Sequence, residues 1–202
     1  MQFKTWLINE EIRNVDGLDD VIERIKSRHP NIQDSLVAKI KEFVAESGVK
    51  KIQIKQFALP ALGASLIDRV LLNTNVLNSN LSFILYVLFH EIAHQYQYKK
   101  YGFGAMWLYF NDDITAQEAI KKLRRIENVA DTYAIRKLKK IQASGEKIDA
   151  SGLHGYYASM PDSNIISYIN LIKKMLKDAG SKDPNKISEA LYNLVMTRMT
   201  GI

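Results

Sequence analysis

The chain contains no cysteine among its 202 residues, and it has only four histidines and four prolines. Without cysteine there is no thiolate metal ligand, so zinc ribbons and other cysteine-built metal sites are excluded. The absence of cysteine also agrees with a reducing compartment such as the cytoplasm. A metal site in this protein has to use histidine and carboxylate side chains.

Long apolar segments are absent as well. The longest apolar run, Phe83 to Phe89, is far shorter than the roughly 18 residues that a membrane-spanning helix requires. The segment from Met1 to Glu11 has no apolar stretch long enough for the hydrophobic region of a signal peptide. We therefore expect no membrane span and a cytoplasmic location.

The composition is that of an ordinary globular domain, with 47% hydrophobic and 25% charged residues. A chain of this length can bury one substantial core, and it shows no repeats or low-complexity segments. We expect a single domain over residues 1–202. Its parts are a helical N-terminal segment (1–48), a sheet with the helices that follow it (49–141) and a C-terminal helical subdomain (142–202).

Positive charge is in excess, with a net charge of +6 and a pI near 9.3. Much of it lies between Lys99 and Lys140. Such a surface could attract nucleic acid through its phosphates. A solvated helix face is the interpretation that we favour, because no motif of basic and aromatic residues accompanies the charge.

The most informative segment is His90-Glu91-Ile92-Ala93-His94, which reads HExxH inside a stretch that looks helical. Four residues of α-helix advance about 6 Å and turn slightly more than once, so both imidazoles face the same way. With this many histidines and glutamates, chance would produce the pattern with a probability of roughly 0.4%. The motif is therefore a strong indication of a metal site.

Two imidazoles on one helix face suit a tetrahedral Zn²⁺ site, which has room for a third protein ligand and a water. Glu91 would then reach that water rather than the metal. It can take the proton of the water as general base and pass it to the leaving amine.

The third ligand has to be His29, His154 or a carboxylate. The segment from Ile120 to Ile141 favours a carboxylate, because Glu127 interrupts its apolar helical stripe. An ionised carboxylate in such a stripe needs a cation as partner. Asp131 lies one turn further along, where it can accept the free N–H of a metal-bound imidazole. Without the HExxH, both would more simply be surface partners of nearby arginines and lysines.

HExxH followed by Glu-Asn-Val-Ala-Asp on a second helix resembles the gluzincin metallopeptidases. The second segment is most similar to the Ste24/HtpX type. The size of the chain, the 33-residue gap from His94 to Glu127 and the lack of membrane spans are more similar to the ImmA/IrrE type. That type usually carries glycine before the second histidine, whereas this chain has Ala93. The resemblance covers about residues 66–141.

This resemblance implies that His90, His94 and Glu127 bind zinc, that Glu91 is the catalytic base and that Asp131 supports a histidine ligand. It implies a zincin-like α+β fold, mostly helical with a small sheet and a central active-site helix. The implied activity is that of a zinc-dependent endopeptidase acting on a protein or peptide substrate.

Hydrophobic periodicity predicts helices on both sides of the small sheet. The expected helices are Leu18–Ile25, Ile32–Val44, one that starts at Asn78–Asn80 and stops near Gly102, the third-ligand helix, Ile165–Lys177 and one from Pro184. The expected strands are Lys51–Phe57 and Arg69–Leu72. The aromatic-rich segment Gly102–Asp113 is expected to be a loop that covers a core.

The resemblance gives Arg69–Asn73 a further role, as an edge strand that lines the cleft and pairs with extended substrate backbone. From the residues alone, an ordinary sheet edge is nearly as good an interpretation.

A peptidase of this type also needs a side chain that stabilises the oxyanion formed on the substrate carbonyl. We expect His154, in a glycine-flanked loop, to supply it, with Tyr133, Tyr156 and Tyr157 as alternatives. A surface histidine in a turn is an equally good interpretation of His154.

These patterns together predict a zinc-dependent metallopeptidase. Two alternatives stay open: a non-enzymatic protein that uses the same scaffold for binding or regulation, and a protease that acts on DNA-associated proteins. The substrate and the oligomeric state do not follow from the residues.

Overall fold

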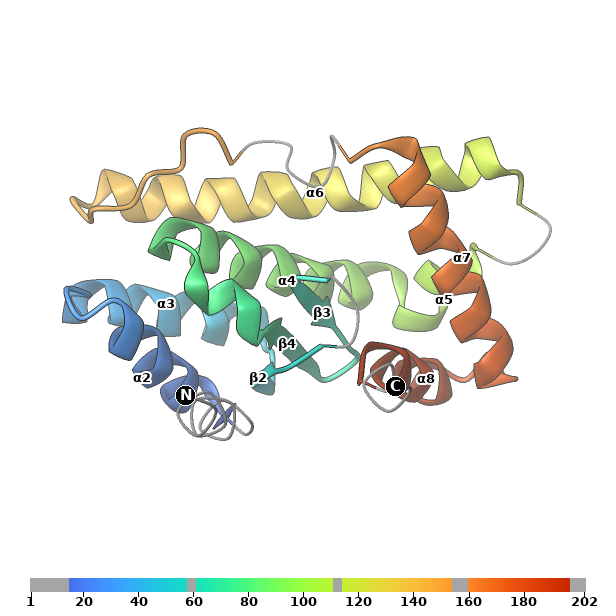
Figure 1. Cartoon of the computed structure of the whole chain (residues 1–202), viewed down its shortest axis with the longest axis horizontal. Helices are drawn as coiled ribbons and strands as arrows, with labels where there is room; N and C mark the ends of the chain where they lie inside the picture. The colour runs from blue at the N-terminus through green and yellow to red at the C-terminus, as the bar shows by residue number, and fades with distance from the viewer. Residues whose placement is uncertain (1–14, 58–60, 111–113, 154–159, 197–202) are drawn as a thin grey trace, which may run out of the picture.

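The protein is mostly helical with a small sheet, which confirms the predicted α+β class (Figure 1). The structure, a computed structural model, describes residues 15–57, 61–110, 114–153 and 160–196. The elements in chain order are β1 (Val15–Asp16), α2 (Leu18–Arg28), α3 (Asp34–Ser47), β2 (Lys51–Lys55), β3 (Gly63–Ser65), β4 (Arg69–Asn73), the 3₁₀ helix η1 (Thr74–Asn78), α4 (Leu81–Tyr101), α5 (Phe103–Leu108), α6 (Ala116–Ala143), α7 (Asp162–Ala179) and α8 (Pro184–Met196).

The sheet has four strands in the order β1-β2-β4-β3. The two predicted strands are confirmed as β2 and β4, which run parallel with Ile52 opposite Val70. β3 pairs antiparallel with β4, so β4 is an interior strand and the prediction that Arg69–Asn73 forms a sheet edge is wrong. The edge belongs to β3. Its three residues, Gly63 to Ser65, are too few to show the alternation by which a strand is recognised in a sequence.

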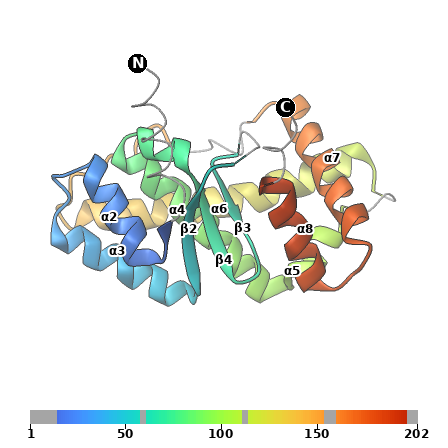
Figure 2. The ribbon, with the colours of Figure 1, turned by 60° about the horizontal axis from the view of Figure 1, so that its bottom comes forward.

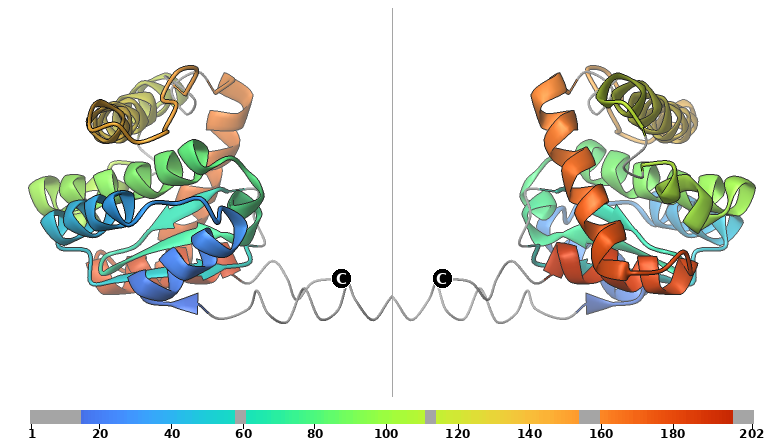
Figure 3. Two further views of the ribbon diagram at one scale, coloured as in Figure 1. Left: turned by 90° about the vertical axis from the view of Figure 1, so that its left-hand side faces the viewer. Right: turned by 90° about the vertical axis from the view of Figure 1, so that its right-hand side faces the viewer.

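Helix α4 lies at the centre of the molecule, between the sheet and α6 (Figure 3). It begins where predicted, with the Asn80 side chain accepting from the Phe83 N–H, and it ends before Gly102, whose φ is 80°. Every residue from Ile84 to Gln95 is buried. A helix covered on all sides needs apolar residues all around, as the run from Phe83 to Phe89 provides. Each polar residue in this helix therefore needs a partner inside the protein.

Two clusters of buried apolar side chains make up the core. The first joins α2, α3 and β2 to the first part of α4 and the C-terminal half of α6. The second joins α5, α7 and α8 to the end of α4 and the N-terminal half of α6. Figure 2 shows the two groups of helices on opposite sides of the strands. On α6 the change from one cluster to the other falls between Ile126 and Ala134.

A short helix, α5, occupies part of the segment Gly102–Asp113 that was predicted to be a loop. Its buried Phe103 packs edge-on against Tyr98, with ring centroids 4.6 Å apart, and Trp107 is also buried. The aromatic residues cover a core, as expected. Six residues are too few for helical periodicity to be visible, which is why the sequence did not indicate this helix. Residues 111–113 lie outside the described ranges.

The outer helices agree with the predicted positions. α3 ends at Gly48 and α7 at Gly180, both in the left-handed region that glycine adopts without strain. α8 begins at Pro184, a favoured first helical residue. None of the helices in the described ranges combines the length and the apolar character needed to cross a bilayer.

Leu138 and Val129 provide a test of how α6 packs, because Leu138 is fully buried whereas Val129 is 51% exposed. We expect Leu138→Ala to lower the free energy of unfolding by about 2–5 kcal/mol, since the missing methyl groups leave a cavity in the first cluster. Val129→Ala, the control on the same helix, should change it by at most about 0.5 kcal/mol. Urea denaturation measures both, and equal effects would contradict this orientation of α6.

Candidate metal centre

Helix α4 carries polar side chains in two adjacent stripes, each repeating every three to four residues, which places its members on one helix face. The stripe facing α6 consists of Tyr86, His90, His94 and Gln97. The stripe facing β3 consists of Glu91, Gln95 and Tyr98. Each stripe therefore joins the central helix to one neighbour.

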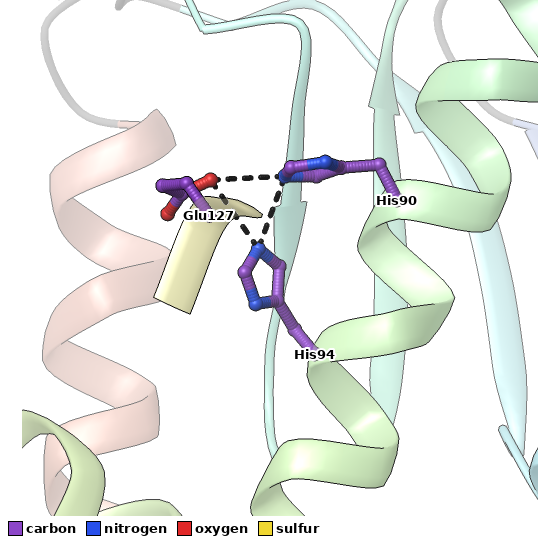
Figure 4. A group of neighbouring side chains, drawn as sticks. All are labelled: His90, His94 and Glu127. Atoms are coloured by element: carbon purple, nitrogen blue, oxygen red, sulfur yellow. Dashed lines mark hydrogen bonds and ion pairs between the residues drawn. The ribbon is translucent and has the colours of Figure 1, made fainter. Parts of the chain in front are cut away.

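His90, His94 and Glu127 form a compact group between α4 and α6 (Figure 4). The Nε2 atoms of the two imidazoles are 3.2 Å apart. Glu127 Oε2 lies 3.0 Å from His90 Nε2 and 3.8 Å from His94 Nε2. Both histidines are buried, and the Glu127 side chain is 12% exposed. This buried group can hold a metal ion.

A second hydrogen bond on each imidazole turns its Nε2 atom towards the group. His90 Nδ1 lies 2.9 Å from Asp131 Oδ1, where it donates to the carboxylate. Asp131 is fully buried and also accepts a hydrogen bond from the hydroxyl of Tyr86. His94 Nδ1 lies 2.7 Å from Gln97 Oε1. Such outer partners set the tautomer and orientation of metal-binding histidines, and here both Nε2 atoms are directed at the same point.

Gln97 links the group to α6 and was not recognised in the sequence. Its Nε2 donates to the carbonyl oxygen of Ile126 at 2.9 Å, which leaves its Oε1 as acceptor for His94. Ile126 directly precedes Glu127, so one amide fixes both a histidine ring and the backbone next to the carboxylate. The only signal in the sequence is that Gln97 follows His94 by three residues and therefore shares its helix face.

The donor set fits a divalent transition metal. Two imidazole nitrogens and one carboxylate oxygen occur together in catalytic zinc sites. Ligand atoms at about 2.0–2.1 Å from a tetrahedral ion are about 3.3 Å apart, and the separations of 3.0, 3.2 and 3.8 Å bracket that value. Other first-row metals accept the same nitrogen and oxygen ligands, so the donor set defines a class of ion rather than one element.

In the metal-free protein, His90 supplies a positive charge beside the carboxylates of Glu127 and Asp131. Burial lowers the pKa of His90, but the hydrogen bonds to Asp131 and Glu127 and the charge of Glu127 outweigh burial and raise the pKa to about 10. Burial raises the pKa of Glu127, but His94 and His90 outweigh burial and lower it overall. At neutral pH a protonated His90 is therefore paired with an ionised Glu127.

His94 and Glu91 favour their neutral forms instead. Burial is the main reason that the pKa of His94 is lowered, and the charge of His90 adds to it. Burial also raises the pKa of Glu91 to about 8, against the opposing charge of His90. His94 therefore presents an unprotonated Nε2 at neutral pH, which is the form that binds metals.

Glu91 lies beside the metal-binding group rather than in it. Its carboxyl packs under β3, where an ideal Cβ built on Gly63 would lie only 2.7 Å from Oε1. The residue is adjacent to His90 in the chain and 5% exposed. This position, next to the ligands but on the other stripe, is suitable for an acid or base that acts close to a metal.

Of the other predicted residues, His29 and Tyr133 are not part of this group. His154, Tyr156 and Tyr157 lie outside the described residues. The ring of Tyr133 packs against Tyr96, with centroids 5.2 Å apart. His29 ends helix α2.

Tyr168 on α7 lies near the site, although its sequence context does not mark it. Burial raises the pKa of its phenol, and the charges of Glu127 and Glu91 raise it further. The phenol therefore keeps its proton at neutral pH and can donate a hydrogen bond. A tyrosine on an amphipathic helix has no local signature of function, because its neighbours are determined by how α7 packs on α6.

Two of the basic residues on α6 form ion pairs with neighbouring helices. Arg124 pairs with Asp162 of α7 at 2.6 Å. Lys137 pairs with Glu46 of α3 at 2.6 Å and lies 3.8 Å from the ring centroid of Phe43. These contacts connect α6 to its neighbours. Attraction of nucleic acid by the remaining basic residues stays a prediction.

No family model, curated protein or solved structure matches this chain at a significant level. The resemblance to the gluzincins therefore stays a prediction that rests on the motif residues.

Zinc binding should release a proton at neutral pH, because the pKa of His90 is about 10 and a ligand nitrogen must lose its proton. Since protons compete with the metal, we expect about one proton released per Zn²⁺ at pH 7 and an apparent affinity that rises about tenfold per pH unit. Calorimetry in buffers of different ionisation enthalpy measures the release. An affinity independent of pH between 6.5 and 8 would mean that His90 is neutral in the metal-free protein.

Gln97→Leu should weaken zinc binding by about 10- to 100-fold, because His94 loses the partner that orients its ring. Gln142→Leu, at an exposed position on α6, is the matched control and should leave the affinity unchanged. Competition with a chromophoric chelator measures both constants. Equal affinities of Gln97→Leu and the unsubstituted protein would show that Gln97 does not support the site.

Proposed function

We propose that the protein is a zinc-dependent metallopeptidase. The observation that best supports this proposal is the convergence of His90, His94 and Glu127 ligand atoms within 4.8 Å, beside the buried carboxyl of Glu91. Structural zinc sites use four protein ligands, whereas catalytic sites use three and leave a position open. Three ligands among the described residues, with an acid group beside them, therefore favour a catalytic site.

The roles of the side chains follow from where they lie. A bound zinc ion would act as a Lewis acid and lower the pKa of water. Glu91 would accept the proton of the attacking water and deliver it to the leaving amine nitrogen. Its pKa of about 8 holds for the protein without an ion, and the positive charge of a bound ion would favour the ionised form that accepts the proton. Asp131 would hold the His90 ring, and Gln97 the His94 ring, against α6.

We assign stabilisation of the oxyanion to Tyr168 among the described side chains. Burial and the charges of Glu127 and Glu91 keep its phenol protonated, so that it can donate to an oxygen that becomes negative. Tyr168 comes from α7, while the ligands come from α4 and α6. Three helices would then enclose the scissile bond.

We assign the binding of extended substrate to β3 in place of Arg69–Asn73. β3 is the last strand of the sheet on this side, and its Gly63 lies against Glu91. A peptide that adds to the outer edge of β3 would continue the sheet through backbone hydrogen bonds. Its scissile bond would then lie close to the base.

A non-enzymatic regulator built on the same scaffold would need the metal ligands but no base. Burying an acid group without a strong partner is unfavourable, by on the order of a few kcal/mol. Glu91 is buried, no hydrogen bond to its carboxyl is found within the described residues, and burial raises its pKa to about 8. A protein that only binds a metal has no use for such a residue, so Glu91 favours the enzyme.

Glu91→Gln should abolish peptide hydrolysis and leave zinc binding intact, because it removes the base but none of the ligands. His94→Ala and Glu127→Ala should lose zinc as well as activity. A casein assay, with and without chelator, and metal analysis of the same samples measure both properties. Glu42→Gln, a change at an exposed glutamate of α3, is the control. Normal turnover by Glu91→Gln would falsify the assignment of the base.

A further inference from the structure

We infer that Gly63 is a positioning residue for Glu91: because it has no side chain, the edge strand β3 lies directly on the glutamate and holds its carboxyl beside the metal ligands. The effect on turnover rests on the proposed function. The packing of Gly63 against Glu91 does not depend on the proposed function.

The space that a side chain at position 63 would need is filled by Glu91. An ideal Cβ on Gly63 would lie 2.6 Å from Cγ, 2.8 Å from Cδ and 2.7 Å from Oε1 of Glu91. All three distances are below 3.0 Å, which real Cβ contacts essentially never reach. Gly63 is not among the glycines with positive φ, so its backbone conformation is open to any residue. The glycine is therefore required for space and not for conformation.

The strand cannot easily move away from the helix, because it is tied down on both sides of Gly63. Gln95 Nε2 donates to Ser65 Oγ and to the Leu66 carbonyl, each at 2.5 Å. Tyr98 donates from its hydroxyl to the Ser65 carbonyl at 3.0 Å. Both donors belong to the same stripe of α4 as Glu91.

Ahead of Gly63, β4 holds the chain. Asn73 Nδ2 donates to the Ala61 carbonyl at 2.7 Å, and the Asn73 N–H donates to the Leu62 carbonyl at 2.9 Å. Five hydrogen bonds to residues 61, 62, 65 and 66 therefore fix the position of the short strand relative to α4 and β4.

Glu91 also has little free space around it, because the residue is only 5% exposed. The charges of His90 and Glu127 act on its carboxyl. A methyl group at position 63 must therefore displace the base, the strand or both. The ligands His90, His94 and Glu127 belong to the α4–α6 contact and are not displaced directly.

A double-mutant cycle in the metal-free protein tests the packing. We expect Gly63→Ala to lower the urea midpoint when Glu91 is present. In the Glu91→Ala background the three clashing atoms are absent, so the same change should leave the midpoint unchanged or raise it. An equal shift in both backgrounds would overturn the inference.

Gly104→Ala is the matched control for this cycle. Gly104 also has no positive φ, and an ideal Cβ there would meet Pro184 Cγ at 3.3 Å and nothing of Glu91. Its effect on the midpoint should therefore be the same whether or not Glu91 is present.

Turnover and zinc affinity test the positioning role. With a quenched fluorescent peptide that the unsubstituted protein cleaves, we expect Gly63→Ala to lower kcat by on the order of 10- to 100-fold, because a displacement of about 1 Å is enough for such a loss. Zinc affinity should stay unchanged. An unchanged kcat, or a loss of activity that merely follows a loss of zinc, would contradict this role.

The two measurements separate this inference from the proposed function. The unfolding cycle can be non-additive while the unsubstituted protein cleaves no peptide. In that case the proposed function and the positioning role fail, but the packing of Gly63 against Glu91 is confirmed. If the cycle is additive, the inference fails whatever the activity.

Discussion

The burial of polar side chains in α4 is the constraint on which the rest of the structure depends. From Ile84 to Gln95 the helix has no face towards solvent, so a side chain with donors or acceptors must find partners in the protein. An unpaired group would reduce stability by on the order of several kcal/mol. α6 supplies partners for Tyr86, His90 and Gln97, whereas Ser65 of β3 and Leu66 supply those of Gln95 and Tyr98. The placement of both elements is therefore decided by polar pairing as well as by apolar packing.

The metal-binding group lies where the two apolar clusters meet, so the core on both sides of it is formed by apolar packing. In the metal-free protein, protonated His90 already pairs with Glu127 and donates to Asp131. The negative charge is thus partly compensated without an ion, and the two large clusters can support the fold. A metal would then add stability according to its concentration relative to its dissociation constant. Small zinc domains, which fold only with their ion, lack such a core.

Features carried by one helix could be predicted from the sequence, because spacing within a helix determines which side chains share a face. That is why Glu127 and Asp131 were recognisable as exceptions in an apolar stripe. Features that depend on the order of strands could not be predicted, so β4 was taken for the edge that β3 forms. Tyr168 and Gln97 were missed for a related reason. Gln97 donates to Ile126 on α6, and Tyr168 on α7 is affected by charges on α4 and α6; nothing near either residue in the chain indicates these elements.

The adjacency of His90 and Glu91 has a geometric reason in this fold. Successive residues of an α-helix point about 100° apart, so two adjacent residues face different parts of the surrounding structure. His90 faces α6, where Asp131 and Glu127 hold it, and Glu91 faces the backbone of β3. The candidate metal-binding group and the proposed base therefore depend on different contacts of one helix. A change in α6 would alter the metal-binding group, and a change in β3 would alter the position of Glu91, so the two can be varied separately.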